Sequence, residues 1–150
     1  MGVTVFNIPL QISEMIRYTE YLTKVKKSEL YRKAISYYIE NNMGITDHVL
    51  YMPLTAKPFK EQVYIHSCKD ALNAYRVKLQ SECAEGLFPK TGKGIMQKKN
   101  RYRNSTIMLQ AIINYLYYLY GGSDTEKPDI IQKGLDYMRE NDLVWKENKS

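Results

Sequence analysis

Cysteine is scarce in this chain, and so are several other residues on which small folds and active sites often depend. The 150 residues include two cysteines, two histidines, one tryptophan and three phenylalanines. Cys68 and Cys83 are too few for a disulfide framework, which favours a reducing compartment, and we expect a cytoplasmic protein. The histidines and cysteines lack metal-ligand spacing, so we expect neither a metal site nor a cofactor.

Long apolar runs are also missing. The most apolar stretch, residues 107–119, is too short to span a bilayer and is interrupted by Gln110 and Asn114. The N-terminus has no basic and apolar signal-peptide pattern. The sequence K-T-G-K-G at 90–94 is not a phosphate-binding loop, because Gly94 stands where Ser or Thr must follow the lysine. We therefore expect no membrane contact and no enzyme.

Positive charge is present in surplus. The net charge is +6, made up of +3 in residues 1–60, +5 in residues 61–122 and −2 in residues 123–150. A basic surplus favours a polyanionic partner. With 44% hydrophobic and 25% charged residues, the chain has the composition of a packed protein.

The periodicity of the apolar residues predicts the same order of elements twice. β-Branched and alternating segments predict strands, and three- and four-residue spacings predict helices. A basic turn at 24–27 and a long turn at 86–103, with six basic and no acidic residues, precede the second helix of each half. The expected elements are a strand at 3–8, helices at 11–24 and 28–41, a linker at 45–60, a strand at 61–67, and helices at 69–83, 105–120 and 128–140.

An internal repeat supports this division. The segment 28–39 aligns without a gap with the segment 105–116, at an offset of 77 residues. Serines align at the two expected N-caps, followed by matched apolar positions that include Ala34 with Ala111 and Ile35 with Ile112. The surrounding strand–helix–turn order repeats as well, which two unrelated amphipathic helices would not share.

The sequence here resembles the ribbon-helix-helix family. A short strand ends in Ile8-Pro9, and Lys27-Ser28-Glu29-Leu30 through Ala34-Ile35 opens the second helix. The second half matches in its strand and in Ser105, Ala111 and Ile112, but it lacks the proline and has a longer turn. The resemblance covers about 95 residues.

The resemblance implies a mostly α fold with one short two-stranded antiparallel β-ribbon. It would consist of tandem ribbon-helix-helix repeats in one chain, forming a pseudo-dimer, plus a C-terminal helix. One strand–helix–helix unit is too small to bury its apolar faces alone. The expected divisions are repeat 1 at 1–44, a linker at 45–60, repeat 2 at 61–122 and a helical tail at 123–150.

The resemblance also implies which residues contact double-stranded DNA. Outward-facing strand residues would read bases in the major groove. With Phe6 and Ile8 facing inward, the first strand presents Val5 and Asn7, and Thr4 is the alternative reader. The base-reading residues are expected to be Val5, Asn7, Gln62, Tyr64 and His66.

The second helix of each half would hold a phosphate at its N-terminus, where amides and the helix dipole favour an anion. Neighbouring cations would neutralise further phosphates. The expected phosphate-binding residues are Lys26, Lys27, Ser28, Arg101, Arg103 and Ser105.

Three functional interpretations follow. The leading one is a sequence-specific DNA-binding protein, acting as a transcriptional repressor or as an accessory factor in plasmid transfer, with a second copy on an adjacent half-site. The second is a protein-interaction module of a mobile element without DNA readout, binding a partner through the amphipathic tail at 128–145. The third is an unrelated helical bundle with no ribbon, which requires residues 3–8 and 62–67 to be unpaired.

Overall fold

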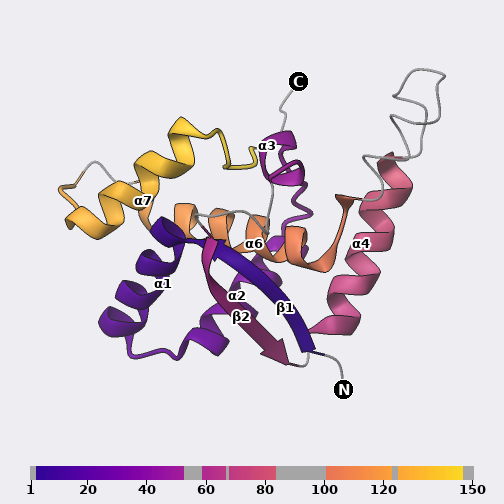
Figure 1. Cartoon of the computed structure of the whole chain (residues 1–150), viewed down its shortest axis with the longest axis horizontal. Coiled ribbons are helices and arrows are strands. Elements are labelled where there is room, and N and C mark those ends of the chain that lie inside the picture. Colours follow the sequence, from indigo (N-terminus) through magenta and orange to yellow (C-terminus); the bar gives the residue numbers. More distant parts are fainter. Residues whose placement is uncertain (1–2, 53–58, 67, 84–100, 123–124, 147–150) are drawn as a thin grey trace.

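The computed structural model describes residues 3–52, 59–66, 68–83, 101–122 and 125–146. Helices dominate it, and one pair of strands lies against them (Figure 1). The elements in chain order are β1 (Val3–Pro9), α1 (Leu10–Thr23), α2 (Lys27–Glu40), α3 (Asp47–Leu50), β2 (Phe59–His66), α4 (Lys69–Cys83), α6 (Asn104–Tyr120) and α7 (Asp129–Glu140).

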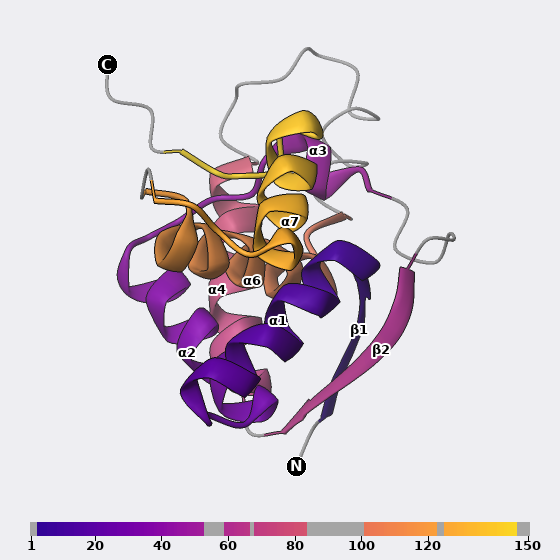
Figure 2. The same cartoon turned by 90° about the vertical axis from the view of Figure 1, so that its left-hand side faces the viewer.

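β1 and β2 form a two-stranded antiparallel sheet. Ile8 is fully buried and Asn7 is partly exposed, so the alternation of a strand defines a covered and an outer face. β1 contacts α6 and α1, and the described helices all lie on one side of the strand pair (Figure 2). Pro9 ends β1 and precedes α1, and its φ of −62° is the value that the proline ring imposes.

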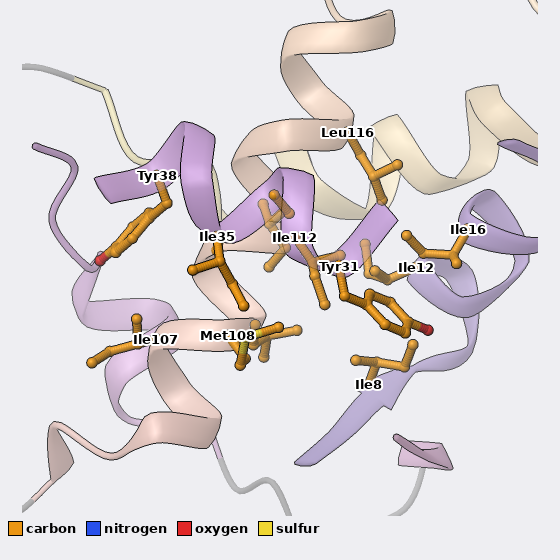
Figure 3. Packing of buried hydrophobic residues seen from close by; sticks show 14 of the residues in the cluster. Ile8, Ile12, Ile16, Tyr31, Ile35, Tyr38, Ile107, Met108, Ile112 and Leu116 are labelled. Carbon is orange, nitrogen blue, oxygen red and sulfur yellow. The ribbon is translucent and has the colours of Figure 1, made fainter. Parts of the chain in front are cut away.

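The centre of the molecule is the contact between α2 and α6. Three of the pairs related by the 77-residue offset are buried in both helices: Leu30 with Ile107, Ala34 with Ala111, and Ile35 with Ile112. Figure 3 shows Ile35, Ile107 and Ile112 of this set, together with Tyr31, whose ring extends toward Ile8 and Ile12. The repeated apolar pattern therefore corresponds to one shared core.

α6 is buried on nearly all sides, unlike its repeat partner. It contacts β1, α1, α2, α3, α4 and α7. Two amide side chains, Gln110 and Asn114, are buried on it at 0% and 4% exposure. Each is paired with a backbone group, as buried amides require. Gln110 Nε2 donates to the Leu143 carbonyl at 2.9 Å, and Gln110 Oε1 accepts from the Thr46 N–H at 3.1 Å.

Asn114 extends this network. Its Nδ2 donates to the Trp145 carbonyl at 2.9 Å, and its Oδ1 accepts from the Trp145 N–H at 3.2 Å and from Gln110 Nε2 at 2.5 Å. The two amides therefore hold both the segment that follows α2 and the segment that follows α7. The two amides that interrupt the apolar run of α6 therefore bind it by hydrogen bonds to two segments distant in sequence.

α2 and α7 end in the same way, which the 77-residue repeat does not predict. Asn42 and Asp142 adopt left-handed conformations with φ of 50° and 53°. In both, the following residue donates its N–H five residues back, Met43 to Tyr38 at 3.2 Å and Leu143 to Met138 at 2.9 Å. This is the Schellman arrangement, which satisfies carbonyls at a helix end. It turns both chain segments back along α6.

The expected fold class is wrong as a description of the whole chain. Residues 123–150 were expected to be a tail, but α7 packs on α1 and α6, and Ile131, Leu135 and Met138 are fully buried. Ile130, next to Ile131 on the same helix, is 39% exposed. Gly134 permits the close approach, because a Cβ there would lie 2.0 Å from Met15 Sδ. The protein is a single helical core rather than two repeats with an appendage, because α6 is apolar all round and needs a further layer.

Several element boundaries also differ from the expectation. The linker at 45–60 contains the short helix α3, with Val49 and Leu50 buried, and β2 begins at Phe59. α2 begins at Lys27 and α6 at Asn104, so the N-caps are Lys26 and Arg103 rather than Ser28 and Ser105. The two N-caps are themselves 77 residues apart, so the repeat holds although the capping residue was misassigned.

Tyr75 on α4 leads to a prediction about alkaline stability. Its hydroxyl donates to the Met43 carbonyl at 2.6 Å, and burial, followed by the nearby Glu82 charge, raises its pKa from 10.0 to about 12. The folded protein therefore holds the phenol proton more tightly than the unfolded chain does. This contribution to stability is complete below pH 10 and is lost as the pH rises toward 12. We expect urea midpoints, followed by Trp145 fluorescence, to fall over this range and to fall less steeply in Tyr75→Phe. An equal pH dependence in both proteins would contradict the assignment.

Candidate nucleic-acid interface

The register of the strand pair places all the expected base-reading residues on one face. Residues directly opposite in an antiparallel pair share a face, and every second residue returns to it. Asn7, which is partly exposed, marks the outer face. The outer pairs are Val3 with His66, Val5 with Tyr64, and Asn7 with Gln62.

Thr4, the alternative reader, occupies the other face. It pairs with Ile65, and it lies four positions before the buried Ile8, an even step along the strand. The alternation therefore groups Thr4 with the covered positions and leaves Val5 outside. The outer face combines two carboxamide residues, one imidazole and one phenol with two valines, a set that offers hydrogen-bond donors, acceptors and methyl groups.

An acidic residue of α1 accepts a backbone hydrogen bond at the start of α2. Glu20 Oε2 accepts the N–H of Lys27 at 2.9 Å, and the carbonyl of Lys26 accepts from Glu29 and Leu30 at 3.0 Å each. Ser28 lies in the first turn and is exposed. The sequence interpretation missed Glu20, although an acidic residue a short turn before a helix start is a recognisable partner for its amides.

The start of α6 is organised differently. Asn104 Nδ2 donates to Asn73 Oδ1 of α4 at 2.8 Å, and the hydroxyl of Thr106 donates to the Arg101 carbonyl at 3.2 Å. Arg101 and Arg103 are exposed, and the Arg101 guanidinium lies 4.8 Å from the centre of the Tyr51 ring. The first turn of α6 contains no acidic residue. Ser105 occupies the position in α6 that Ser28 occupies in α2.

The two helix starts lie on either side of the strand pair. In Figure 1 the turn between α1 and α2 lies to the left of β1 and β2, and the segment leading into α6 lies to their right. The two segments that lie on either side of the strand pair in this view contain the expected phosphate-binding residues Lys26, Lys27, Ser28, Arg101, Arg103 and Ser105. The other basic residues of the long turn, Lys90, Lys93, Lys98 and Lys99, lie outside the described residues.

Other candidate sites are few in the described part of the chain. It contains no group of three or more histidine, cysteine or carboxylate residues able to hold a metal ion. Within it, no helix has the length and apolar character needed to cross a bilayer. A hollow of about 540 Å³ beside α3 is bordered by His48 and Tyr51, and His48 Nδ1 lies 3.6 Å from Asp142 Oδ2 on an exposed surface.

Comparison of the chain with protein-family models, with curated proteins and with solved structures gives no match. The candidate interface is therefore described from its residues and its geometry alone.

Proposed function

We propose that this protein binds double-stranded DNA by placing the outer face of the β1–β2 pair in the major groove. The observation that carries the proposal is the register, which aligns Val5 with Tyr64 and Asn7 with Gln62 on the face turned away from the helices. A two-stranded ribbon fits the major groove of B-DNA, which is about 12 Å wide. The resemblance to ribbon-helix-helix proteins belongs to this proposal and rests on the sequence motifs.

The charge of the flanking segments supports the same orientation. Lys26 precedes α2, and Arg101 and Arg103 precede α6, all three exposed. With the outer face of the strands in the groove, these cations would face the DNA backbone on both sides. Phosphate contacts of this kind set position and affinity, whereas base contacts set specificity.

The proposal is tested by measuring binding to a labelled duplex from the region upstream of the protein's own coding sequence. We expect affinity to fall steeply as salt rises, with a log–log slope of about −0.9 for each phosphate contact. The double variant Gln62→Ala/Tyr64→Ala should lose roughly 5- to 150-fold in affinity for its preferred site. Arg103→Ala should weaken binding to all duplexes and reduce the salt slope by about one contact.

Lys133→Ala is the matched control for the charge change. Lys133 is exposed on α7, an element that contacts α1 and lies apart from the strand pair in Figure 1. This variant should bind like the unmodified protein. Failure to bind any duplex at low salt would refute the proposed function, and equal losses in Arg103→Ala and Lys133→Ala would refute the phosphate assignment.

The proposed DNA binding indicates a class of cellular role and not an individual process. For this protein we propose a transcriptional repressor or an accessory factor in the transfer of a mobile element. A second copy on an adjacent half-site would raise the affinity of either assembly.

The alternative of a partner-binding tail is less favoured. The apolar side of α7 that would dock a partner is already buried against this chain, with Ile131 and Leu135 fully buried. Deleting residues 128–145 should therefore destabilise the core instead of merely removing a docking site.

A further inference from the structure

The two strands of the outer face differ in chemistry. Along β1 the outer positions hold two apolar residues and one carboxamide, whereas along β2 all three are able to form hydrogen bonds. In chain order, these positions are Val3, Val5 and Asn7 on β1, and Gln62, Tyr64 and His66 on β2.

The register converts this difference into a difference between the two ends of the face. Asn7 stands opposite Gln62 at one end, and Val3 stands opposite His66 at the other. A two-fold axis through the middle of the face would exchange Asn7 with His66 and Val3 with Gln62. Because these residues are not chemically equivalent, the face has no two-fold symmetry, in contrast to the face that two identical strands would form.

We infer that the protein recognises a non-palindromic duplex site in a single orientation, with its adenine contacts at the end of the ribbon where Asn7 and Gln62 are paired. This inference rests on the proposed duplex binding. Carboxamides pair bidentately with N6 and N7 of adenine, whereas valine can only contact a thymine methyl group. Two paired carboxamides therefore give one end a preference for adenines that the other end lacks.

The charges at the two helix starts are unequal as well. Glu20 accepts the Lys27 amide at the start of α2, and Glu29 in its first turn pairs with Arg32 at 3.0 Å. Arg101 and Arg103 precede α6, whose first turn has no acidic residue. Lys26 and Lys27 stand beside these acidic residues at the start of α2, so the two helix starts present different charged surroundings to a phosphate.

The length of the face predicts where the contacts fall. Val3 and Asn7 are four residues apart, which corresponds to about 13 Å of strand and to about four base pairs of B-DNA. The base pairs read at the two ends should therefore be separable by mutation.

The experiment selects binding sites from a random duplex library with the full chain and with Asn7→Ala, Gln62→Ala and His66→Ala. We expect a consensus without dyad symmetry. Asn7→Ala and Gln62→Ala should relax the same one or two adjacent A·T pairs, each by roughly 5- to 150-fold. His66→Ala should relax positions about four base pairs away. Trp145 fluorescence and the melting temperature of each variant show that it is folded.

Each remaining outcome is decisive. A palindromic consensus, or relaxation at opposite ends by Asn7→Ala and Gln62→Ala, overturns the inference while leaving duplex binding intact. Binding without any sequence preference also overturns it, but not the proposed function. Absence of binding by the unmodified protein removes the proposed function and the inference together.

Discussion

Asn114→Leu is expected to lower the free energy of unfolding by roughly 2–4 kcal/mol, because it leaves buried hydrogen-bonding groups without a partner. The Asn114 amide bonds both the N–H and the carbonyl of Trp145, and its oxygen also accepts from Gln110. Leucine has a similar volume but cannot replace any of these bonds. Each unsatisfied buried group costs about 1–3 kcal/mol.

The chain provides its own probe for this effect. Trp145 is the only tryptophan, and its indole packs so closely on Gly44 that a Cβ there would lie 2.7 Å from Nε1. When the segment after α7 detaches from α6, Trp145 becomes more exposed to water. We therefore expect a red-shifted emission in native buffer, together with a lower urea midpoint.

The control for this change is Asn141→Leu. Asn141 is exposed, and its Nδ2 donates only to the Tyr137 carbonyl at 2.9 Å. Its loss should cost less than about 1 kcal/mol and leave the tryptophan emission unchanged. If Asn114→Leu were as stable as the unmodified protein, the buried network would not hold the two segments on α6.

Gly134→Ala is the second substitution with a large expected effect. The sign of its change in the free energy of unfolding is the informative result. In an open helix interior, alanine stabilises relative to glycine by about 1 kcal/mol. At position 134 the new Cβ would lie 2.0 Å from Met15 Sδ and 2.5 Å from Met15 Cγ, so α7 or Met15 must move. We expect a net destabilisation of roughly 1–3 kcal/mol, as overpacking of a core typically produces. Urea unfolding gives this value directly.

A second-site change separates overpacking from other causes. In a Met15→Ala background the obstructing atoms are absent, so Gly134→Ala should cost less or become stabilising. Gly122→Ala is the matched control, because nothing lies within 4 Å of a Cβ there. If Gly134→Ala were more stable than the unmodified protein, α7 would not pack against α1 as described.

The local elements could be predicted from sequence because they depend on residues close together along the chain. The β-branched segment before Pro9 and the helical spacings of α2 and α6 were sufficient for their assignment. The start of α2 was placed one residue late, because serine is the commoner N-cap, whereas here Glu20 supplies an acceptor from a neighbouring helix. A cap from outside the helix cannot be recognised from the helix alone.

The outer face was predictable in part for the same reason. The alternation of β2 separates Gln62, Tyr64 and His66 from Val63 and Ile65 without reference to other elements. The alternation of β1 was ambiguous between Val5 and Thr4, because both faces of that strand are rich in apolar residues. The burial of Ile8 and the pairing of Asn7 with Gln62 resolve this ambiguity.

The sequence by itself determined the two strands, every longer helix but not the short α3, and the 77-residue correspondence between α2 and α6, because periodicity and local propensity act over a few residues. Only the tertiary structure decided that α7 belongs to the core, that Gln110 and Asn114 bind the backbone of two distant segments, and which strand residues stand opposite one another. These features depend on contacts between residues far apart in sequence. A buried amide or a helical glycine shows its role only when its partner is in place.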